Sequence, residues 1–145
     1  MVKKFYILGV IMMTSIVTMA NDVIVAVNQL PEQAQVFMKT YFAQDNIAYA
    51  TADKTVGFIT EYNVRLADGT EIEFSRDGSL KKVDCKMRPI PTGVVPQKIV
   101  AYIQTAFPNT MIKEYKIEFF GQKVELTNEL ELVFDKDGNP TGIDD

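Results

Sequence analysis

The sequence predicts an α+β protein: a tandem repeat of a helix plus an antiparallel β-sheet, with the helices packed on one face of the sheet and the other face open. Three observations predict this fold. A set of apolar, proline and turn residues occurs twice, each copy opens with an apolar stripe at helical spacing, and each continues with segments in which apolar and polar residues alternate. The chain has 145 residues, of which 47% are hydrophobic and 23% are charged, a composition typical of a globular protein.

The repeat relates matching residues by two constant offsets. One offset holds through the start of each copy, and a second, slightly shorter one holds after a change in length. The matched pairs are Leu30 with Val95, Pro31 with Pro96, Phe37 with Tyr102, Met38 with Ile103, Phe42 with Phe107, Val64 with Val124, Leu66 with Leu126, Ile72 with Leu132, Phe74 with Phe134, Asp77 with Asp137 and Gly78 with Gly138. The sequence therefore predicts a signal peptide over residues 1–20, a first repeat over 21–85, a linker over 86–94 and a second repeat over 95–145.

Each repeat begins with a predicted helix that follows a proline. Pro31 and Pro96 suit the first helical position, because proline has a fixed φ and the helix needs no backbone donor there. The apolar stripes are Ala34, Phe37, Met38, Tyr41 and Phe42 in the first helix, and Ile99, Tyr102, Ile103, Ala106 and Phe107 in the second. Pro108 ends the second helix, because it cannot continue the backbone hydrogen bonds.

Alternation predicts the strands that follow each helix. The strands are expected over residues 62–66, 71–74 and 80–83 in the first repeat, and over 123–126 and 131–134 in the second. Asp-Gly pairs at 68–69, 77–78 and 137–138 predict tight turns, and further strands are expected near 47–51 and 112–119. A sheet with this alternation has one buried face, which the helices cover, and one wet face.

The N-terminal segment over residues 1–20 is typical of a secretory signal peptide. Lys3 and Lys4 precede an uncharged apolar run over residues 5–17, and the small residues read by a signal peptidase end at Ala20. The rival interpretation is a membrane anchor, but the run is shorter than the roughly 20 apolar residues that span a bilayer. We therefore expect cleavage after Ala20 and a periplasmic or extracellular protein without a membrane span.

Composition removes several kinds of site. The chain has no histidine, which excludes catalytic triads and zinc sites that need this side chain, and Cys85 has no partner in the chain for a disulfide. The net charge of −4 gives no basic surface for nucleic acid. Glu71 and Glu73 share a strand face, as paired catalytic carboxylates would, but nothing in the sequence indicates a cleft around them. We therefore expect no nucleic-acid partner, no catalytic residues and no enzyme activity.

The order of these motifs resembles the PepSY-like family, small secreted proteins of Bacteroides-type bacteria with a fold like that of the beta-lactamase inhibitory protein. The resemblance rests on the Leu-Pro helix start, the Tyr-x-Val-x-Leu strand at 62–66, the Asp-Gly turns and the second series at 132–138, and it spans nearly the whole chain from Asn21. It implies export, a tandem-repeat α+β fold and the binding, with inhibition, of another protein. The contact residues of that inhibitor form no motif that matches positions here, so none is transferred.

The open sheet face supplies the candidate partner-binding residues. They are Asn63, Arg65, Glu71, Glu73, Lys123, Glu125 and Glu131. A broad rigid surface can dock a protein, with Arg65 the strongest anchor by residue type. The same residues also fit cross-strand charge pairing that keeps the sheet soluble. The presence of Tyr49, Tyr115 or Phe120 on this face would favour binding.

Asp135, Asp137 and Asn139 form a candidate calcium site. Alternating side-chain oxygens suit a hard cation, but the glycine comes at the fourth position of this loop, whereas an EF-hand has it at the sixth and a bidentate glutamate at the twelfth. A plain hairpin turn is the other interpretation. No other cofactor is predicted.

Together these observations predict a secreted or periplasmic, non-enzymatic module that binds a protein partner through its open sheet face, as an inhibitor of a protease or another envelope enzyme. The alternative is a calcium- or small-ligand-responsive periplasmic protein, which the acidic C-terminal turn motivates. A third interpretation is a structural component of the envelope.

Overall fold

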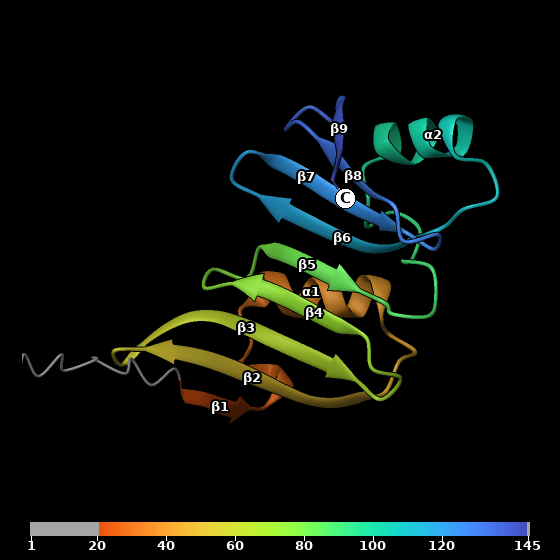
Figure 1. The fold of residues 1–145 in the computed structure, drawn as a ribbon. Coiled ribbons are helices and arrows are strands. Elements are labelled where there is room, and N and C mark those ends of the chain that lie inside the picture. The colour runs from red at the N-terminus through yellow and green to blue at the C-terminus, as the bar shows by residue number, and fades with distance from the viewer. Residues whose placement is uncertain (1–20, 145) are drawn as a thin grey trace, which may run out of the picture.

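The computed structural model describes residues 21–144, which form nine antiparallel strands in one sheet, each paired with its neighbour along the chain (Figure 1). The strands of the first half are β1 (Asn21–Val25), β2 (Ile47–Thr55), β3 (Phe58–Leu66), β4 (Glu71–Ser75) and β5 (Leu80–Asp84). Those of the second half are β6 (Ile112–Glu118), β7 (Gly121–Leu126), β8 (Glu131–Phe134) and β9 (Pro140–Asp144). The helices are α1 (Glu32–Tyr41), α2 (Gln97–Ala106) and the short 3-10 helix η1 (Val27–Gln29).

The two α-helices follow the predicted apolar stripes. Their buried residues are Ala34 and Met38 in α1, and Ile99 and Ile103 in α2. Pro31 and Pro96 take the N-cap position with extended backbone, so each helix starts one residue later than a proline at the first helical position would give. The prolines thus mark the helix starts without entering the helices.

Two apolar clusters, one beneath each helix, hold the helices against the sheet. At the centre of each cluster is a fully buried phenylalanine, Phe74 in the first half and Phe134 in the second. Phe74 meets the ring of Phe37 edge-on with centroids 5.5 Å apart, and Phe134 meets Tyr102 in the same way at 5.7 Å. Edge-to-face contacts of this kind are favoured between aromatic rings. The same helix-to-sheet contact is therefore built twice.

The turns that follow β4 and β8 pack against the first turns of the helices. Gly78 has a φ of +91°, and a Cβ at this position would lie 2.7 Å from the Cβ of Pro31. Gly138, with a φ of +81°, lies in the same way against the side chains of Lys98 and Ile99. Backbone conformation and space therefore both favour glycine at position 78, whereas at position 138 the positive φ alone favours it.

Strand β5 joins the two halves by pairing with β6. The register sets Val83 opposite Tyr115 and Asp84 opposite Glu114. β5 pairs with β6 in the same way that β1 pairs with β2. The last strand of the first half therefore serves as the first strand beside the second half. Val83 is fully buried at this junction, which makes the apolar face of the sheet continuous.

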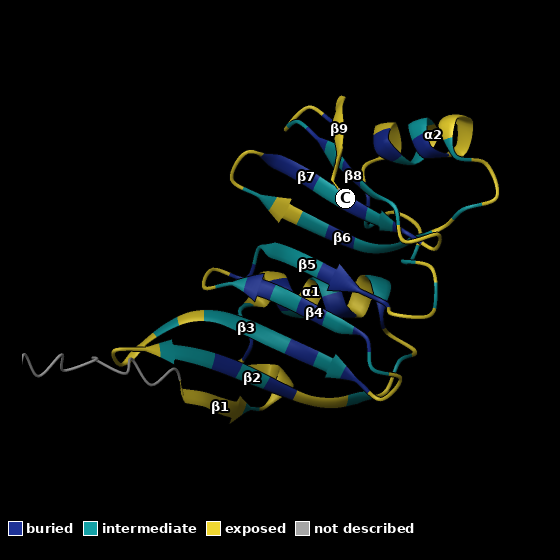
Figure 2. Cartoon of the chain, viewed as in Figure 1, coloured by how far each residue is buried: buried dark blue, intermediate teal, exposed yellow. Residues whose placement is uncertain are grey.

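The predicted α+β fold with one open sheet face is confirmed, and the strands expected near 47–51 and 112–119 are present as β2 and β6. The edge strands β1 and β9 and helix η1 were not predicted; all of β9 and all of β1 except Val25 are exposed (Figure 2). The predicted signal peptide over residues 1–20 and its cleavage after Ala20 lie outside the described residues. In the part of the chain that is described, no helix combines the length and apolar character needed to cross a membrane.

Candidate functional site

Polar side chains cover the sheet face that lies opposite the helices, and the strand register sorts them into rows. One row, which we call the carboxylate row, carries an acidic side chain on every strand from β4 to β9. Its members in register are Glu71, Asp84, Glu114, Glu125, Glu131 and Asp144. The adjacent row carries Glu73, Lys82, Lys116 and Lys123. Because β5 pairs with β6, both rows run across the junction between the halves.

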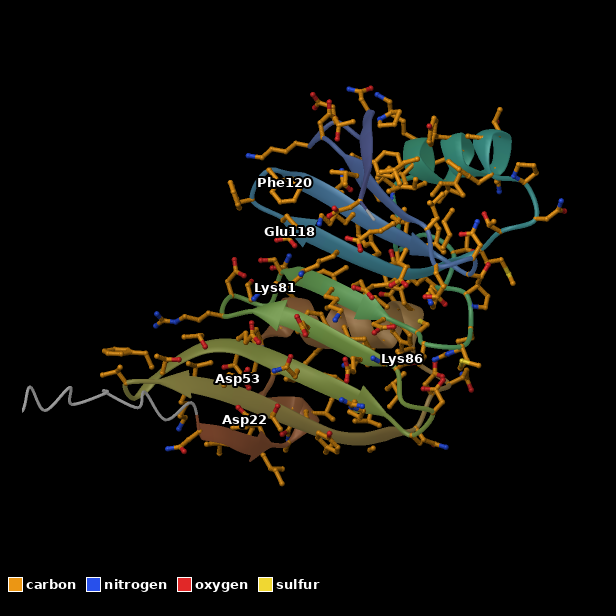
Figure 3. The ribbon with its side chains drawn as sticks, in the orientation of Figure 1. Asp22, Asp53, Lys81, Lys86, Glu118 and Phe120 are labelled. Carbon is orange, nitrogen blue, oxygen red and sulfur yellow. The ribbon has the colours of Figure 1, made fainter. Side chains whose placement is uncertain are left out.

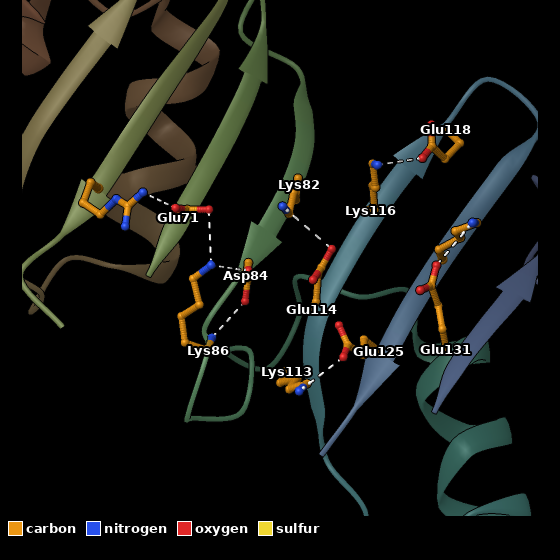
Figure 4. Close-up of polar contacts among 12 residues, drawn as sticks. Glu71, Lys82, Asp84, Lys86, Lys113, Glu114, Lys116, Glu118, Glu125 and Glu131 are labelled. Carbon is orange, nitrogen blue, oxygen red and sulfur yellow. Dashed lines mark hydrogen bonds and ion pairs between the residues drawn. The ribbon is translucent and has the colours of Figure 1, made fainter. Parts of the chain in front are cut away.

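Lysine side chains bridge neighbouring members of the carboxylate row. Lys86 Nζ lies 2.7 Å from Asp84 Oδ2 and 3.4 Å from Glu71 Oε2 (Figure 4). Lys123 Nζ lies 3.2 Å from Glu131 Oε1 and 2.7 Å from Asp144 Oδ2. These contacts support the charge-pairing interpretation of the open face, although exposed ion pairs each contribute little to stability.

Glu114, at the junction, has the weakest pairing in the carboxylate row. Its nearest cation is Lys82, whose Nζ lies 3.9 Å from Glu114 Oε1. Burial raises the pKa of Glu114; Lys82 opposes this effect, and the adjacent Asp84 and Glu125 reinforce it. Burial acts in the same direction on Asp84, but the hydrogen bonds and charge of Lys86 outweigh it and lower the pKa of Asp84. The junction therefore holds a glutamate that takes up a proton more readily than an ordinary one.

The first half of the open face contains a shallow pocket of about 230 Å³. Four of the seven candidate binding residues line it: Asn63, Arg65, Glu71 and Glu73. Arg65 forms an ion pair with Glu71 at its rim. Tyr49 of β2 also lines the pocket, lies opposite Arg65 in the register and is 47% exposed. An exposed tyrosine beside a guanidinium is the composition of binding hot spots.

The other three candidate residues, Lys123, Glu125 and Glu131, lie on β7 and β8, outside this pocket. They belong to the ion pairs of the second half, in which Lys113 Nζ lies 3.3 Å from Glu125 Oε1. The structure therefore does not gather the seven candidates into one site. It divides them between the pocket and the ion-paired second half.

Of the three aromatic residues considered for this face, only Tyr49 lies on it among the described strands. Tyr115 is buried in the core of the second half, and Phe120 is 43% exposed at the turn between β6 and β7. Lys123 Nζ lies 5.9 Å from the centroid of the Phe120 ring, so this ring borders the second half of the face. The pocket around Tyr49 is thus the part of the face that combines an exposed aromatic side chain with an arginine.

Three carboxylates meet at the outer edge of the same face, on β1, β2 and β3. Asp53 is registered with Asp22 on one side (Figure 3). On the other side it is registered with Glu61. Burial raises the pKa of Asp53 to about 6, and Glu61 and Asp22 add to the rise. Burial also acts to raise the pKa of Glu61, but Lys81, whose Nζ lies 2.5 Å from Glu61 Oε2, reverses this and lowers it. Asp53 therefore keeps its proton to a higher pH than an ordinary aspartate does.

We expect Asp53→Asn to stabilise the protein at neutral pH. Because folding raises the pKa of Asp53 from 3.8 to about 6, the protonated form contributes stability that is full below pH 3.8 and is lost as the pH rises through 6. Removing the ionisation should add about 1 kcal/mol to the free energy of unfolding at pH 7.5, because solvent screening reduces the roughly 3 kcal/mol that the full shift would give, and little at pH 3.5. Urea denaturation at both pH values measures the difference, and an equal effect at both would contradict this account.

The candidate calcium residues form a hydrogen-bonded turn. Asp135 Oδ1 accepts the backbone N–H groups of Asp137 and Asn139 at 2.9 and 2.8 Å, and Asp135 Oδ2 accepts the Asn139 side-chain amide at 3.0 Å. Lys98 Nζ donates to Asn139 Oδ1 at 2.6 Å. Within the described residues, no group of three acidic or cysteine side chains is arranged to hold a metal ion. The geometry supports the turn interpretation, and calcium binding stays a prediction.

Sequence reasoning missed the acidic and basic residues at the junction. Asp84 and Glu114 stand side by side only because β5 pairs with β6, and Lys86 reaches Asp84 from the loop after β5. The one signal that pointed to them is the alternation within each strand, which assigns a face but no neighbour. Pairing between segments this far apart is not visible in local periodicity.

The fold and its surface define a structural class of protein: tandem helix-and-sheet proteins with one uncovered, charged sheet face. The family described as "Putative beta-lactamase-inhibitor-like, PepSY-like" matches residues 60–140, and the chain belongs to this family. The match runs from β3 to β9 and so includes parts of both halves. The resemblance predicted from the doubled motifs is confirmed.

Solved structures from Bacteroides share the whole fold. A "putative periplasmic protein" of the DUF2874 family from Bacteroides vulgatus is 34% identical, with a TM-score of 0.80 over 86% of this chain and 98% of that one. A "putative calcium-regulated periplasmic protein" from Bacteroides thetaiotaomicron is 30% identical, with a TM-score of 0.80 over 86% and 97%. A second Bacteroides vulgatus protein, a "putative periplasmic protein of unknown function", is 32% identical, with a TM-score of 0.79 over 86% and 100%. No curated protein matches the chain.

Proposed function

We propose that the protein is a periplasmic, non-enzymatic binding protein that holds a protein partner against its open sheet face. The observation that carries the proposal is the one-sided packing of the sheet: both helices cover the apolar face, and the described residues leave the opposite face of all nine strands uncovered. Membership of a beta-lactamase-inhibitor-like family supports a partner that is itself an envelope enzyme, such as a protease, which the bound protein would inhibit.

The pocket around Tyr49 is the proposed centre of the contact. Tyr49 offers a rigid ring with little conformational entropy to lose, and Arg65 offers donors beyond its pair with Glu71. A partner side chain that has both an apolar part and a hydrogen-bond acceptor would pack on the Tyr49 ring and accept a hydrogen bond from Arg65. The backbone pairing of β2, β3 and β4 holds the residues that line the pocket in place, which lowers the conformational entropy lost on binding. Inhibition would then follow from occlusion of the partner's surface, without chemistry.

Charge reversal on the open face tests the proposal. Glu73 lines the pocket and takes part in no ion pair among the described residues, so Glu73→Lys should leave the fold intact and weaken partner binding at least tenfold, about 1.4 kcal/mol. The matched control is Glu32→Lys on α1, which changes the net charge equally on the helix side. Partners captured from periplasmic extract by the unaltered protein supply the assay. Equal loss of binding in both variants, or in neither, would contradict the proposal.

Export is part of the same proposal. Relatives described as periplasmic support it, and the basic and apolar N-terminal pattern is that of a signal peptide. We expect the protein recovered from the periplasm to begin at Asn21. Its intact mass measures the cleavage site directly, and a mass that still includes the segment 1–20 would contradict cleavage after Ala20.

A calcium response is the second candidate function, favoured by one observation: a relative that is 30% identical is described as calcium-regulated. If Asp135, Asp137 and Asn139 held calcium, then calcium at 100 times its dissociation constant would stabilise the folded protein by about 2.7 kcal/mol. Thermal melts with calcium and with magnesium measure this gain. Asp135→Asn should abolish the stabilisation by calcium if the turn binds it, whereas the control Asp22→Asn should keep it. An unchanged stabilisation in Asp135→Asn would exclude the turn as the calcium site.

A further inference from the structure

A cavity of about 340 Å³ lies on the helix side of the second half, between α2 and the segment that leads into it. Val95, Val100 and Ile103 form apolar parts of its wall, and no lining residue carries a charge. The volume is in the range of small-ligand sites. Because no lining residue offers an opposite charge, the lining favours an uncharged occupant.

The repeat shows what fills the matching place in the first half. α1 and α2 match position for position at the offset that relates Leu30 to Val95, so Gln35 of α1 corresponds to Val100 of α2. Gln35 Nε2 donates to the carbonyl of Leu30 at 2.7 Å and to that of Asn28 at 3.2 Å. In the first half, therefore, a side-chain carboxamide of the protein itself ties the helix to the segment before it.

The backbone before the two helices is built alike. The N–H of Gln29 donates to Ala26 O at 2.9 Å, and at the matching place the N–H of Val94 donates to Pro91 O at 3.3 Å. Val95 corresponds to Leu30, and both are buried. In the described part of the chain no side chain donates to the Val95 carbonyl. The second half thus repeats the carbonyl that binds a carboxamide but replaces the glutamine with valine.

We propose that this cavity binds the carboxamide of a glutamine side chain in an uncharged peptide segment. The amide NH₂ of that side chain takes the place of Gln35 Nε2 and donates to the Val95 carbonyl, while its methylene groups pack against Val100 and Ile103. Gln97 and Gln104, which lie on the same side of α2 and also line the cavity, offer donors and acceptors to the peptide backbone. This site lies on the opposite side of the sheet from the proposed partner-binding face.

A peptide titration tests the ligand chemistry. Acetyl-Ala-Gln-Leu-amide is titrated into the isotopically labelled protein while amide chemical shifts are recorded, with the peptides in which glutamate or leucine replaces glutamine as comparisons. We expect saturable shifts confined to α2 and residues 89–95, and at least tenfold weaker binding of both comparison peptides. Shifts that map to the pocket at Tyr49, equal binding of all three peptides or no saturable shift would each overturn the proposal.

Exchange of the matched residues tests the site itself. Val100→Gln should close the cavity with the protein's own carboxamide, raise the melting temperature and reduce peptide binding at least tenfold. Gln35→Val should lower the melting temperature and open a second site, which would add shifts around α1 in the same titration. Unchanged peptide affinity in Val100→Gln would overturn the proposal, and because partner capture by the open face is measured separately, either proposal can fail alone.

Discussion

Phe74→Ala and Phe134→Ala are each expected to lower the free energy of unfolding by about 3–5 kcal/mol. Both rings are fully buried at the centre of their clusters and meet an aromatic side chain of the overlying helix edge-on. Alanine would leave a cavity between a helix and a paired sheet, two rigid elements that cannot close around it. Native proteins are stable by only about 5–15 kcal/mol, so either change removes a large share.

Urea denaturation followed by circular dichroism measures this loss. Val36→Ala is the matched control, because Val36 is an apolar residue of α1 that is 56% exposed and should change stability by less than about 0.5 kcal/mol. Since one continuous sheet carries both clusters, we expect a single transition for each variant. A loss below about 1 kcal/mol at either phenylalanine would contradict the assigned core.

Gly121→Ala is expected to cost about 3 kcal/mol or more. A Cβ at this position would lie 2.1 Å from the Phe134 carbonyl oxygen and 3.0 Å from the Asp135 Cα. These are backbone atoms at the end of β8, and moving them would break the pairing of Gln122 with Phe134. Nothing flexible is available to relieve the clash, so the variant must distort the edge between β7 and β8.

Gly142→Ala is the matched control for this change, because a Cβ on Gly142 meets no atom within 4 Å. We expect thermal melts to separate the two variants clearly, with Gly142→Ala close to the unaltered protein. Equal stability of both variants would show that β7 and β8 do not approach as closely as described.

The core was predictable because each helix and strand carries its own periodicity. Val64, Leu66 and Ile72 were assigned to one face by alternation alone, and all three are buried. Their counterparts in the second half follow from the repeat, so each assignment had two independent supports. The division into residues 21–85, 86–94 and 95–145 stays a prediction.

The edges of the sheet and the arrangement of its polar face were less predictable. β1 is almost wholly exposed and β9 contains Pro140 and Gly142, so neither segment shows the alternation of a half-buried strand. The position of Asp84 opposite Glu114 across the junction depends on which strands pair. Arg65 was assigned to the right face, and its ion pair with Glu71 shows that a candidate binding residue also takes part in charge pairing. Local sequence sets the face on which a residue lies, and tertiary pairing sets its neighbours.

Site-specific photocrosslinking in the periplasm tests most directly whether the uncovered side of the nine strands is where another protein docks. A photoreactive amino acid at position 73, at the rim of the Tyr49 pocket, is compared with one at position 39 on the exposed surface of α1. We predict an adduct of discrete mass from position 73 and none from position 39. Adducts from position 39 alone, or none from either position, would contradict the claim that a partner protein docks on this side of the sheet.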